Sequence, residues 1–189
     1  ERLAAALALL LITQRDAVGL VRFDETVRAV VPSRARRAHW RRIIAALDGL
    51  ASGRDSRAPE ARESAARLLR RPGLVVLVSD LLLEADPLLR SVRALRAAGH
   101  AVTVLHLMDP AERELPAAGT VRFRDPESGH EVPAAAADVR DAYRATVAAA
   151  IAEWRAALAA AGATYEPVDT DSPFGVPLRR AFAERQRMP

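Results

Sequence analysis

Apolar residues are distributed along the first third of the chain in patterns that predict a helix, a hairpin and a second helix. The segment Arg2–Thr13 is almost uniformly Ala and Leu, too long for a typical strand, which predicts a buried helix. Two short apolar runs, Ala17–Phe23 and Thr26–Val31, are separated by a polar turn and predict a β-hairpin. We expect Pro32 and Ser33 to end the second strand and to lead into a helix.

The remaining pattern alternates between helices and short runs of Val and Leu, as is typical of strands covered on both faces. It predicts helices at Arg36–Leu50, Glu60–Arg71, Pro87–Ala98, Asp138–Ala161 and Val176–Arg187, and strands at Leu74–Val78, Ala101–Leu107 and Thr164–Val168. We expect residues 116–134 to form a small excursion outside the main sheet, and an antiparallel ribbon is one structure that fits this segment. Such alternation indicates an α/β fold with a doubly wound, mostly parallel sheet, helices on both faces and one antiparallel hairpin strand near the N-terminus.

Length and composition indicate one domain over residues 1–189 with a core of Ala, Val and Leu. Half of the 189 residues are hydrophobic but only 4% are aromatic. The absence of cysteine excludes disulfides, thiolate catalysis and Cys-based zinc sites. A formal net charge of +4 is too small for binding a polyanion over the whole surface. The apolar run Leu3–Ile12 is shorter than a membrane span, so we expect a cytoplasmic protein with no span in this chain.

The segment Arg34–Arg42 combines five arginines with His39 and Trp40, a composition that can bind phosphates and stack on bases. Trp40, however, shares helical spacing with Ile43 and Leu47. We therefore interpret the arginines as the solvated face of an amphipathic helix and expect no nucleic-acid partner.

Three predicted strands end in an acid, at Asp80, Asp109 and Asp169. Ligands of open α/β sheets bind at the carboxyl ends of the strands, so these acids could gather around Mg²⁺. The simpler interpretation is that each aspartate caps the helix that follows it. A Mg²⁺-dependent hydrolase using Asp80, Asp169 and Asp171 is the alternative function. It requires the carboxylates to lie within a few ångströms of one ion.

The four histidines show no paired ligand spacing, and His106, within an apolar strand, is expected to be a hydrogen-bonded core residue. No GxSxG, P-loop or dinucleotide fingerprint occurs. The usual acyl-transfer and nucleotide-binding classes therefore lack their sequence signal.

Several sequence segments resemble those of the bacterial von Willebrand factor A-like proteins that accompany MoxR AAA ATPases, a family named domain of unknown function fifty-eight. They are RDAVGLVRFDETVRAVVPSRARRAHWRRIIAAL, GLVVLVSDLL, HLMDPAERELPAAGTVRFRDPESGHE, VRDAYRATV and DTDSPFGVPLRRAFAER. The resemblance implies a doubly wound sheet whose central first strand, with a DxSxS loop, precedes Glu1, so that this chain is an N-terminally truncated domain.

The resemblance also implies a metal-ion-dependent adhesion site. Asp80 matches the family's aspartate after strand four, and Ser56 is the candidate for the hydroxyl ligand from the loop Ala51–Pro59. Mg²⁺ would be bound in the complete protein only. The implied function is that of a non-enzymatic protein-interaction module acting with a MoxR-type AAA ATPase in assembly or maturation of a partner.

Overall fold

The computed structural model describes residues 1–24, 27–48, 68–115, 119–124, 131–173, 175–176 and 178–179. The chain divides into two compact units, Glu1–Gly73 and Leu74–Pro189. The predicted loop Ala51–Pro59 lies outside the described residues, as do most of the two predicted helices Glu60–Arg71 and Val176–Arg187. The single domain expected from the length stays a prediction.

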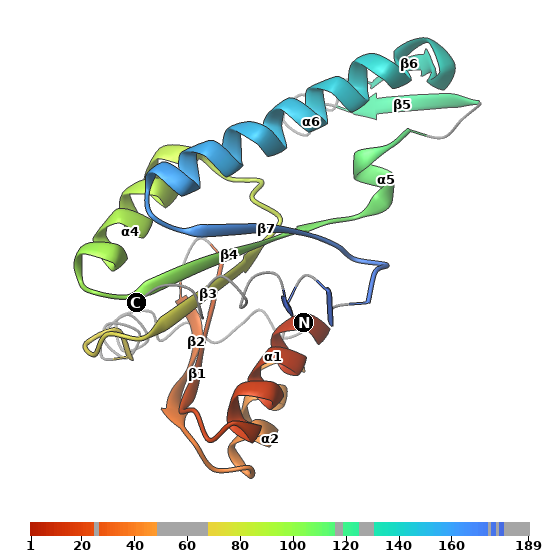
Figure 1. The fold of residues 1–189 in the computed structure, drawn as a ribbon. Helices are drawn as coiled ribbons and strands as arrows, with labels where there is room; N and C mark the ends of the chain where they lie inside the picture. Colours follow the sequence, from red (N-terminus) through yellow and green to blue (C-terminus); the bar gives the residue numbers. More distant parts are fainter. Residues whose placement is uncertain are drawn as a thin grey trace. The chain divides into compact units, whose positions relative to one another are not determined.

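The first unit packs two helices against a hairpin (Figure 1). Helix α1 (Arg2–Thr13) has the predicted bounds, strands β1 (Val18–Phe23) and β2 (Val27–Arg34) pair antiparallel, and α2 (His39–Asp48) follows. The apolar face of α1 meets those of β2 and α2 in one small core. Its buried members are Ala8, Ile12, Val31, Ile43 and Leu47.

Pro32 and Ser33 do not end the second strand, which corrects the prediction made from the sequence. Strand β2 continues to Arg34, which pairs with Val18, while Val31 pairs with Leu20. Two residues of β2 therefore lie opposite the single Gly19, which is the arrangement of a β-bulge. A bulge accommodates proline because the extra residue needs no ladder hydrogen bond.

Helix α2 has the amphipathic orientation predicted for it. The indole Nε1 of Trp40 donates to the carbonyl of Ala5 over 3.3 Å, and His39 is buried, with Nε2 3.1 Å from the carbonyl of Val18. The arginines Arg36, Arg37, Arg41 and Arg42 are exposed. Trp40 therefore packs against the core of the first unit.

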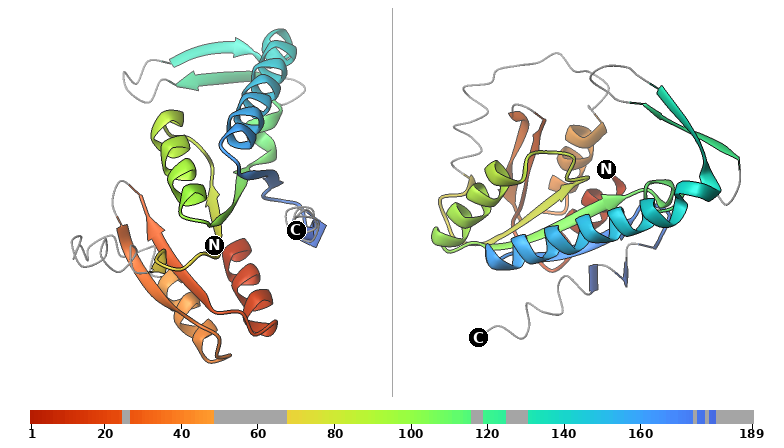
Figure 2. Two further views of the ribbon diagram at one scale, coloured as in Figure 1. Left: turned by 60° about the vertical axis from the view of Figure 1, so that its left-hand side comes forward. Right: turned by 90° about the horizontal axis from the view of Figure 1, so that it is seen from above.

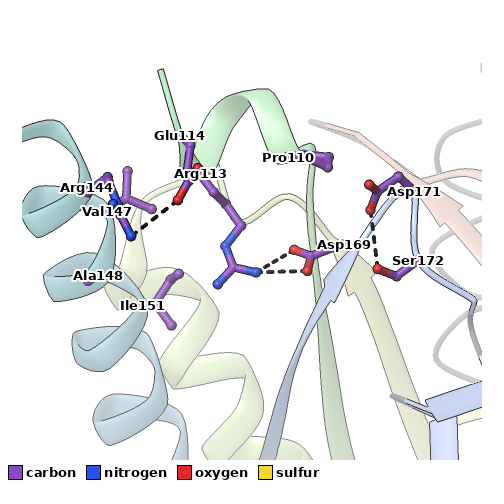
Figure 3. A pocket seen from close by; sticks show the side chains of 10 residues that line it. All are labelled: Pro110, Arg113, Glu114, Arg144, Val147, Ala148, Ile151, Asp169, Asp171 and Ser172. Carbon is purple, nitrogen blue, oxygen red and sulfur yellow. Dashed lines mark hydrogen bonds and ion pairs between the residues drawn. The ribbon is translucent and has the colours of Figure 1, made fainter. Parts of the chain in front are cut away.

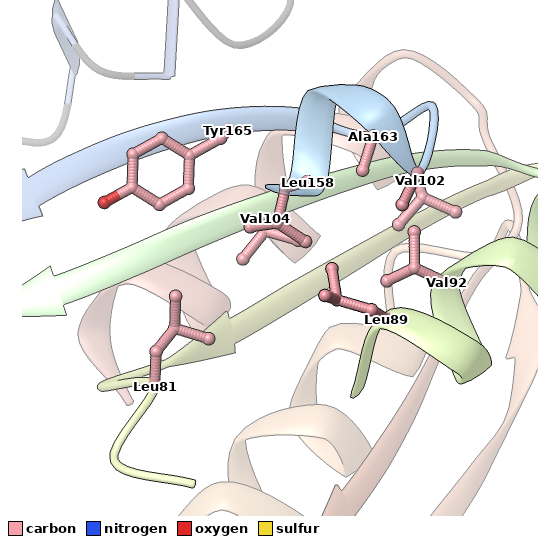
Figure 4. Close-up of a cluster of buried hydrophobic side chains, with 9 residues drawn as sticks. Leu81, Leu89, Val92, Val102, Val104, Leu158, Ala163 and Tyr165 are labelled. Carbon is pink, nitrogen blue, oxygen red and sulfur yellow. The ribbon is translucent and has the colours of Figure 1, made fainter. Parts of the chain in front are cut away.

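The second unit is built on a three-stranded parallel sheet in the order β3-β4-β7. Its strands are β3 (Leu74–Ser79), β4 (Ala101–Met108) and β7 (Thr164–Asp169). Helices α4 (Ala85–Ala97) and α6 (Ala136–Ala160) lie side by side on one face of this sheet (Figures 1 and 2). The core between them is formed mainly by leucine and valine side chains of α4, α6, β4 and the loop after β3, together with Tyr165 of β7 (Figure 4).

An excursion between β4 and α6 contains the predicted antiparallel ribbon. After the short helix α5 (Pro110–Arg113), strand β5 (Thr120–Arg124) pairs with β6 (Glu131–Ala135), and the ribbon lies beside the first turns of α6 (Figure 2). The described residues thus form a mixed α/β fold with a parallel three-stranded sheet and an antiparallel hairpin. None of the helices described is long and apolar enough to cross a membrane.

Candidate functional site

The carboxyl edge of the parallel sheet carries the three acids that the sequence placed at strand ends. Asp80 follows β3, Asp109 follows β4, and Asp169 is the last residue of β7. Their side chains have three different partners, so each acid has a separate structural role.

Asp109 caps a helix, as predicted. Its Oδ1 accepts a hydrogen bond of 2.9 Å from the backbone N–H of Ala111. The carboxylate of Glu112 in turn accepts one of 2.9 Å from the N–H of Asp109, which completes a capping box at the start of α5. The hydroxyl of Thr170 donates to its other oxygen over 3.3 Å. Asp109 therefore joins α5 to the end of β7.

Asp169 is not a cap but one half of an ion pair. Nη1 of Arg113, on α5, lies 2.7 Å from Oδ1 and 2.9 Å from Oδ2 of Asp169. The two residues are far apart in the sequence, and this part-buried pair fixes α5 against β7. A charge-assisted contact of this kind is stronger than a hydrogen bond between neutral groups.

Asp80 organises the loop that leaves β3, which also differs from the capping role expected of it. Its Oδ1 accepts from the N–H of Leu82 over 3.2 Å, and the hydroxyl of Ser79 accepts from the N–H of Leu81 over 3.1 Å. Leu81 has a positive φ of 55° and a buried side chain, 4% exposed. Leu82 and Leu83 point outward, 83% and 42% exposed.

His106 of β4 connects this loop to β7 and is the hydrogen-bonded core residue that was predicted. Its Nε2 lies 2.9 Å from the carbonyl of Asp80, and its Nδ1 lies 2.7 Å from the hydroxyl of Tyr165. A carbonyl only accepts, so Nε2 carries the proton and the phenol donates to Nδ1. Burial lowers the pKa of His106 and raises that of Tyr165, which favours this neutral pair.

The strand order contradicts the alternative in which Asp80 and Asp169 share one ion. Strand β4 lies between β3 and β7. Adjacent strands are about 4.8 Å apart, so the two strand ends are separated by roughly 10 Å. Asp169 is moreover paired with Arg113. The arrangement needed for the proposed hydrolase is therefore absent from this edge.

The metal ligands expected from the family resemblance are only partly placed. Ser56 lies outside the described residues, and Asp80 brings one exposed carboxylate to the end of β3. Within the described part of the chain no three His, Asp or Glu side chains converge in a way that could hold a metal ion. Because Mg²⁺ requires near-octahedral oxygen coordination, these residues alone do not form its site.

A pocket of about 470 Å³ opens beside the end of β7, between α5 and α6 (Figure 3). Its apolar wall is formed by Val147, Ala148 and Ile151 of α6. The polar lining consists of Arg113, Glu114, Arg144, Asp169, Asp171 and Ser172, with Pro110 at the edge. Sequence reasoning identified Asp169 and Asp171 but missed both arginines, because nothing in the local pattern distinguishes them from the many surface arginines.

The chain belongs to the family described as "Protein of unknown function DUF58", which it matches over residues 1–153. It is 32% identical over 164 residues to the uncharacterized proteins Rv1480 of Mycobacterium tuberculosis and Mb1516 of Mycobacterium bovis. The aligned region is 83% of this chain and 50% of each relative, so the chain spans about half the length of these curated relatives.

Two solved structures share the fold. The conserved hypothetical protein BatB from Bacteroides thetaiotaomicron matches with a TM-score of 0.56 and 17% identity, over 99% of this chain and 89% of that one. An aerotolerance-related membrane protein from Bacteroides fragilis matches with a TM-score of 0.53 and 18% identity, with the same coverage. At these identities the likeness concerns the fold alone.

Proposed function

We propose that this chain is a non-enzymatic protein-interaction module that binds its partner through the loop at the end of β3. The observation that carries the proposal is the exposure of Leu82 and Leu83, 83% and 42%, immediately after Asp80. Covering two adjacent large apolar side chains in a complex would remove apolar surface from water, which favours binding. They stand at the carboxyl edge, where open α/β sheets bind their ligands.

The loop is built to hold these leucines in a fixed position. Leu81 adopts a left-handed conformation that costs a leucine about 1–3 kcal/mol and persists only where the surroundings impose it. Burial of the Leu81 side chain, the hydrogen bonds to Ser79 and Asp80, and the contact of His106 with the Asp80 carbonyl together impose it. A loop already ordered before binding loses less entropy on association.

Charge around the loop defines the chemistry of its partner. The exposed charged residues of the segment from residue 80 to residue 86 are Asp80, Glu84 and Asp86, all acidic. A complementary surface has an apolar pocket with a basic rim. The family resemblance favours a MoxR-type AAA ATPase as the protein that carries it, acting in the cytoplasm in the assembly or maturation of a further protein.

The proposal also covers the detailed architecture of the sheet and the binding of a metal ion. The parallel order β3-β4-β7, with α4 and α6 on one face, fits one half of the doubly wound von Willebrand factor A-like sheet that the family resemblance implies. Asp80 would contribute one carboxylate to Mg²⁺, with the remaining ligands, Ser56 among them, outside the described residues.

A pull-down of the full-length protein with its neighbouring MoxR-type ATPase, with and without Mg²⁺, tests the function. Replacing Leu82 and Leu83 together by serine should abolish recovery of the ATPase. Serine at Leu9 and Leu10, an adjacent pair that is 45% and 44% exposed on α1, is the control and should leave it unchanged. No ATPase recovered in either condition, or undiminished recovery with the loop variant, would count against the proposal.

A further inference from the structure

The segment that joins β2 to α2 carries a group of exposed arginines with no acid among them. We call this group the arginine patch, and its members are Arg34, Arg36, Arg37, Arg41 and Arg42. Within the described part of the chain none of the five forms an ion pair. Arg34 donates to the adjacent carbonyl of Ser33 over 3.2 Å. The guanidinium groups are therefore available to an anion from outside the molecule.

The arginine patch lies where positive charge is unfavourable for the folded chain. The carbonyls of Arg36 and Arg37 accept hydrogen bonds from the first two N–H groups of α2, at 2.8 and 3.2 Å, so the turn leads directly into the helix. Arg41 and Arg42 lie in the first turn of α2, which contains no acid. The N-terminal end of a helix carries partial positive charge and disfavours nearby cations. The arginines thus reduce stability unless an anion is bound.

Two acids border the arginine patch without neutralising it. Asp16 lies two residues before Val18, which pairs with Arg34, and Asp48 is the last residue of α2. Asp48 is six residues beyond Arg42, or about 9 Å along the helix axis. Five cations therefore stand against two acids, and none of the cations is ion-paired with either acid.

The excess of positive charge extends to the whole of the first unit. Residues 1–73 contain 15 arginines and 8 acids, whereas residues 74–189 contain 13 arginines and 16 acids. The formal charges of the two units are thus +7 and −3, although the net charge of the chain is only +4. The small total charge conceals one strongly basic unit.

The arginine patch lacks the side chains that recognise nucleic-acid bases. Trp40 packs against the core of the first unit and donates its indole N–H to Ala5, and His39 is buried. Single strands are bound by exposed aromatic rings on which the bases stack. The segment Arg34–Arg42 also contains no Ser, Thr, Asn or Gln, which supplement arginine in protein–DNA contacts. The patch therefore offers charge without base recognition.

We propose that the arginine patch binds the surface of a membrane that contains anionic phospholipids. Guanidinium groups match phosphate geometry with two parallel hydrogen bonds, and clusters of basic residues are typical of attachment to such surfaces. The exposed residues between and beside the arginines are small, so a flat surface can approach them; they are Ala35, Ala38 and Ala45. This attachment requires no membrane-spanning helix and is separate from the proposed partner binding by the loop after β3.

Co-sedimentation of the 189-residue chain with lipid vesicles tests the proposal. Vesicles made of equal parts phosphatidylglycerol and phosphatidylcholine should carry the protein into the pellet at low salt. Vesicles of phosphatidylcholine alone should leave it in solution. Raising the salt to about 1 M should release the protein from the anionic vesicles, because charges are then screened over about 3 Å.

Variants show whether the arginine patch is responsible. Arg41→Gln combined with Arg42→Gln should weaken binding to the anionic vesicles about thirtyfold, or about fivefold for each charge removed. The melting temperature of this variant should not fall, because the replaced cations lie at the unfavourable end of α2. Arg41→Lys combined with Arg42→Lys keeps both charges and should retain most of the binding. Arg90→Gln combined with Arg93→Gln, at two exposed arginines of α4, is the matched control and should have no effect.

Four results would overturn the proposal: no sedimentation with anionic vesicles at low salt, equal sedimentation with both kinds of vesicle, unchanged binding in the glutamine variant of α2, or an equal loss in the α4 control. Binding to a DNA duplex at the same salt, without binding to the vesicles, would assign the arginine patch to nucleic acid and would also overturn the proposal.

Discussion

Gly19 occupies a position at which even a methyl group would not fit. A Cβ added there would lie 2.8 Å from Oγ of Ser33 and 3.0 Å from the carbonyl oxygen of Val31. Both atoms belong to β2: Ser33 is one of the two bulged residues, and Val31 is the paired residue that precedes them. The bulge and the glycine therefore depend on each other.

Gly19→Ala should destabilise the first unit by roughly 1–3 kcal/mol, the usual cost of an overpacked site. Gly73→Ala, where the nearest atom to the new Cβ is 3.9 Å away, is the matched control. Urea unfolding of both variants measures the effect. Equal stability of the two would show that β2 shifts to make room.

His106 makes the stability of the second unit depend on pH. Burial lowers its pKa below the ordinary value, so the folded state binds a proton less readily than the unfolded state. Stability is therefore retained above the ordinary pKa and lost as the pH falls through it. The melting temperature should rise between pH of about 5.5 and 7.5.

His106→Gln should reduce the slope of the melting temperature against pH, because the titrating group is gone. Tyr165→Phe removes the phenol but leaves the buried imidazole, so the slope should persist in that variant. Thermal melts of the three proteins across this pH range make the comparison. Parallel slopes for the wild type and His106→Gln would contradict the assignment.

At the scale of elements, the short helix α5 depends on its cap. Asp109→Ala removes both the acceptor for the N–H of Ala111 and the contact with Thr170, and should cost about 0.5–2 kcal/mol. Asp86→Ala, in the first turn of α4, where the N-cap residue makes no side-chain cap hydrogen bond, should cost less. Chemical unfolding of the second unit measures both. An equal loss would mean that the capping box contributes little.

Helices and strands were predictable because their signals are local. The apolar run of α1, the helical spacing of Trp40 and Ile43, and the Val-rich β3 each determine one element from neighbouring residues. Pro32 misled the prediction because a bulge depends on the partner strand, here on Gly19, and not on the proline's own neighbours.

The site was less predictable because it depends on strand order and on distant pairs. The sequence located Asp80, Asp109 and Asp169 at strand ends but not the intervening position of β4. The partner of Asp169 is Arg113, 56 residues away, and no periodicity relates the two. Asp109 was predictable as a cap because aspartate favours such positions, whereas the capping box with Glu112 emerged from the structure.

At the scale of the whole molecule, the chain has two tryptophans, one in each unit. Trp40 packs in the core of the first unit, and Trp154 packs against the core of the second. Among the described residues the first unit has only a two-stranded sheet, and a unit of this size buries less of its surface on folding.

We therefore expect the first unit to unfold at a lower denaturant concentration than the second. Single-tryptophan variants Trp154→Phe and Trp40→Phe report on the two units separately by fluorescence. Adding Gly19→Ala should move only the transition seen by Trp40. Coincident transitions, both moved by that substitution, would instead show one cooperative domain, as the length of the chain suggested.

The bulge in β2 has a consequence for how the molecule behaves at high concentration. Within the described residues β2 pairs with β1 alone, so its other edge could template the strand of a second molecule. Pro32 interrupts the row of backbone donors that such a template requires, and the bulge twists the strand locally. We therefore expect Pro32, the residue that misled the sequence-based prediction, to hinder edge-to-edge pairing between molecules at high concentration.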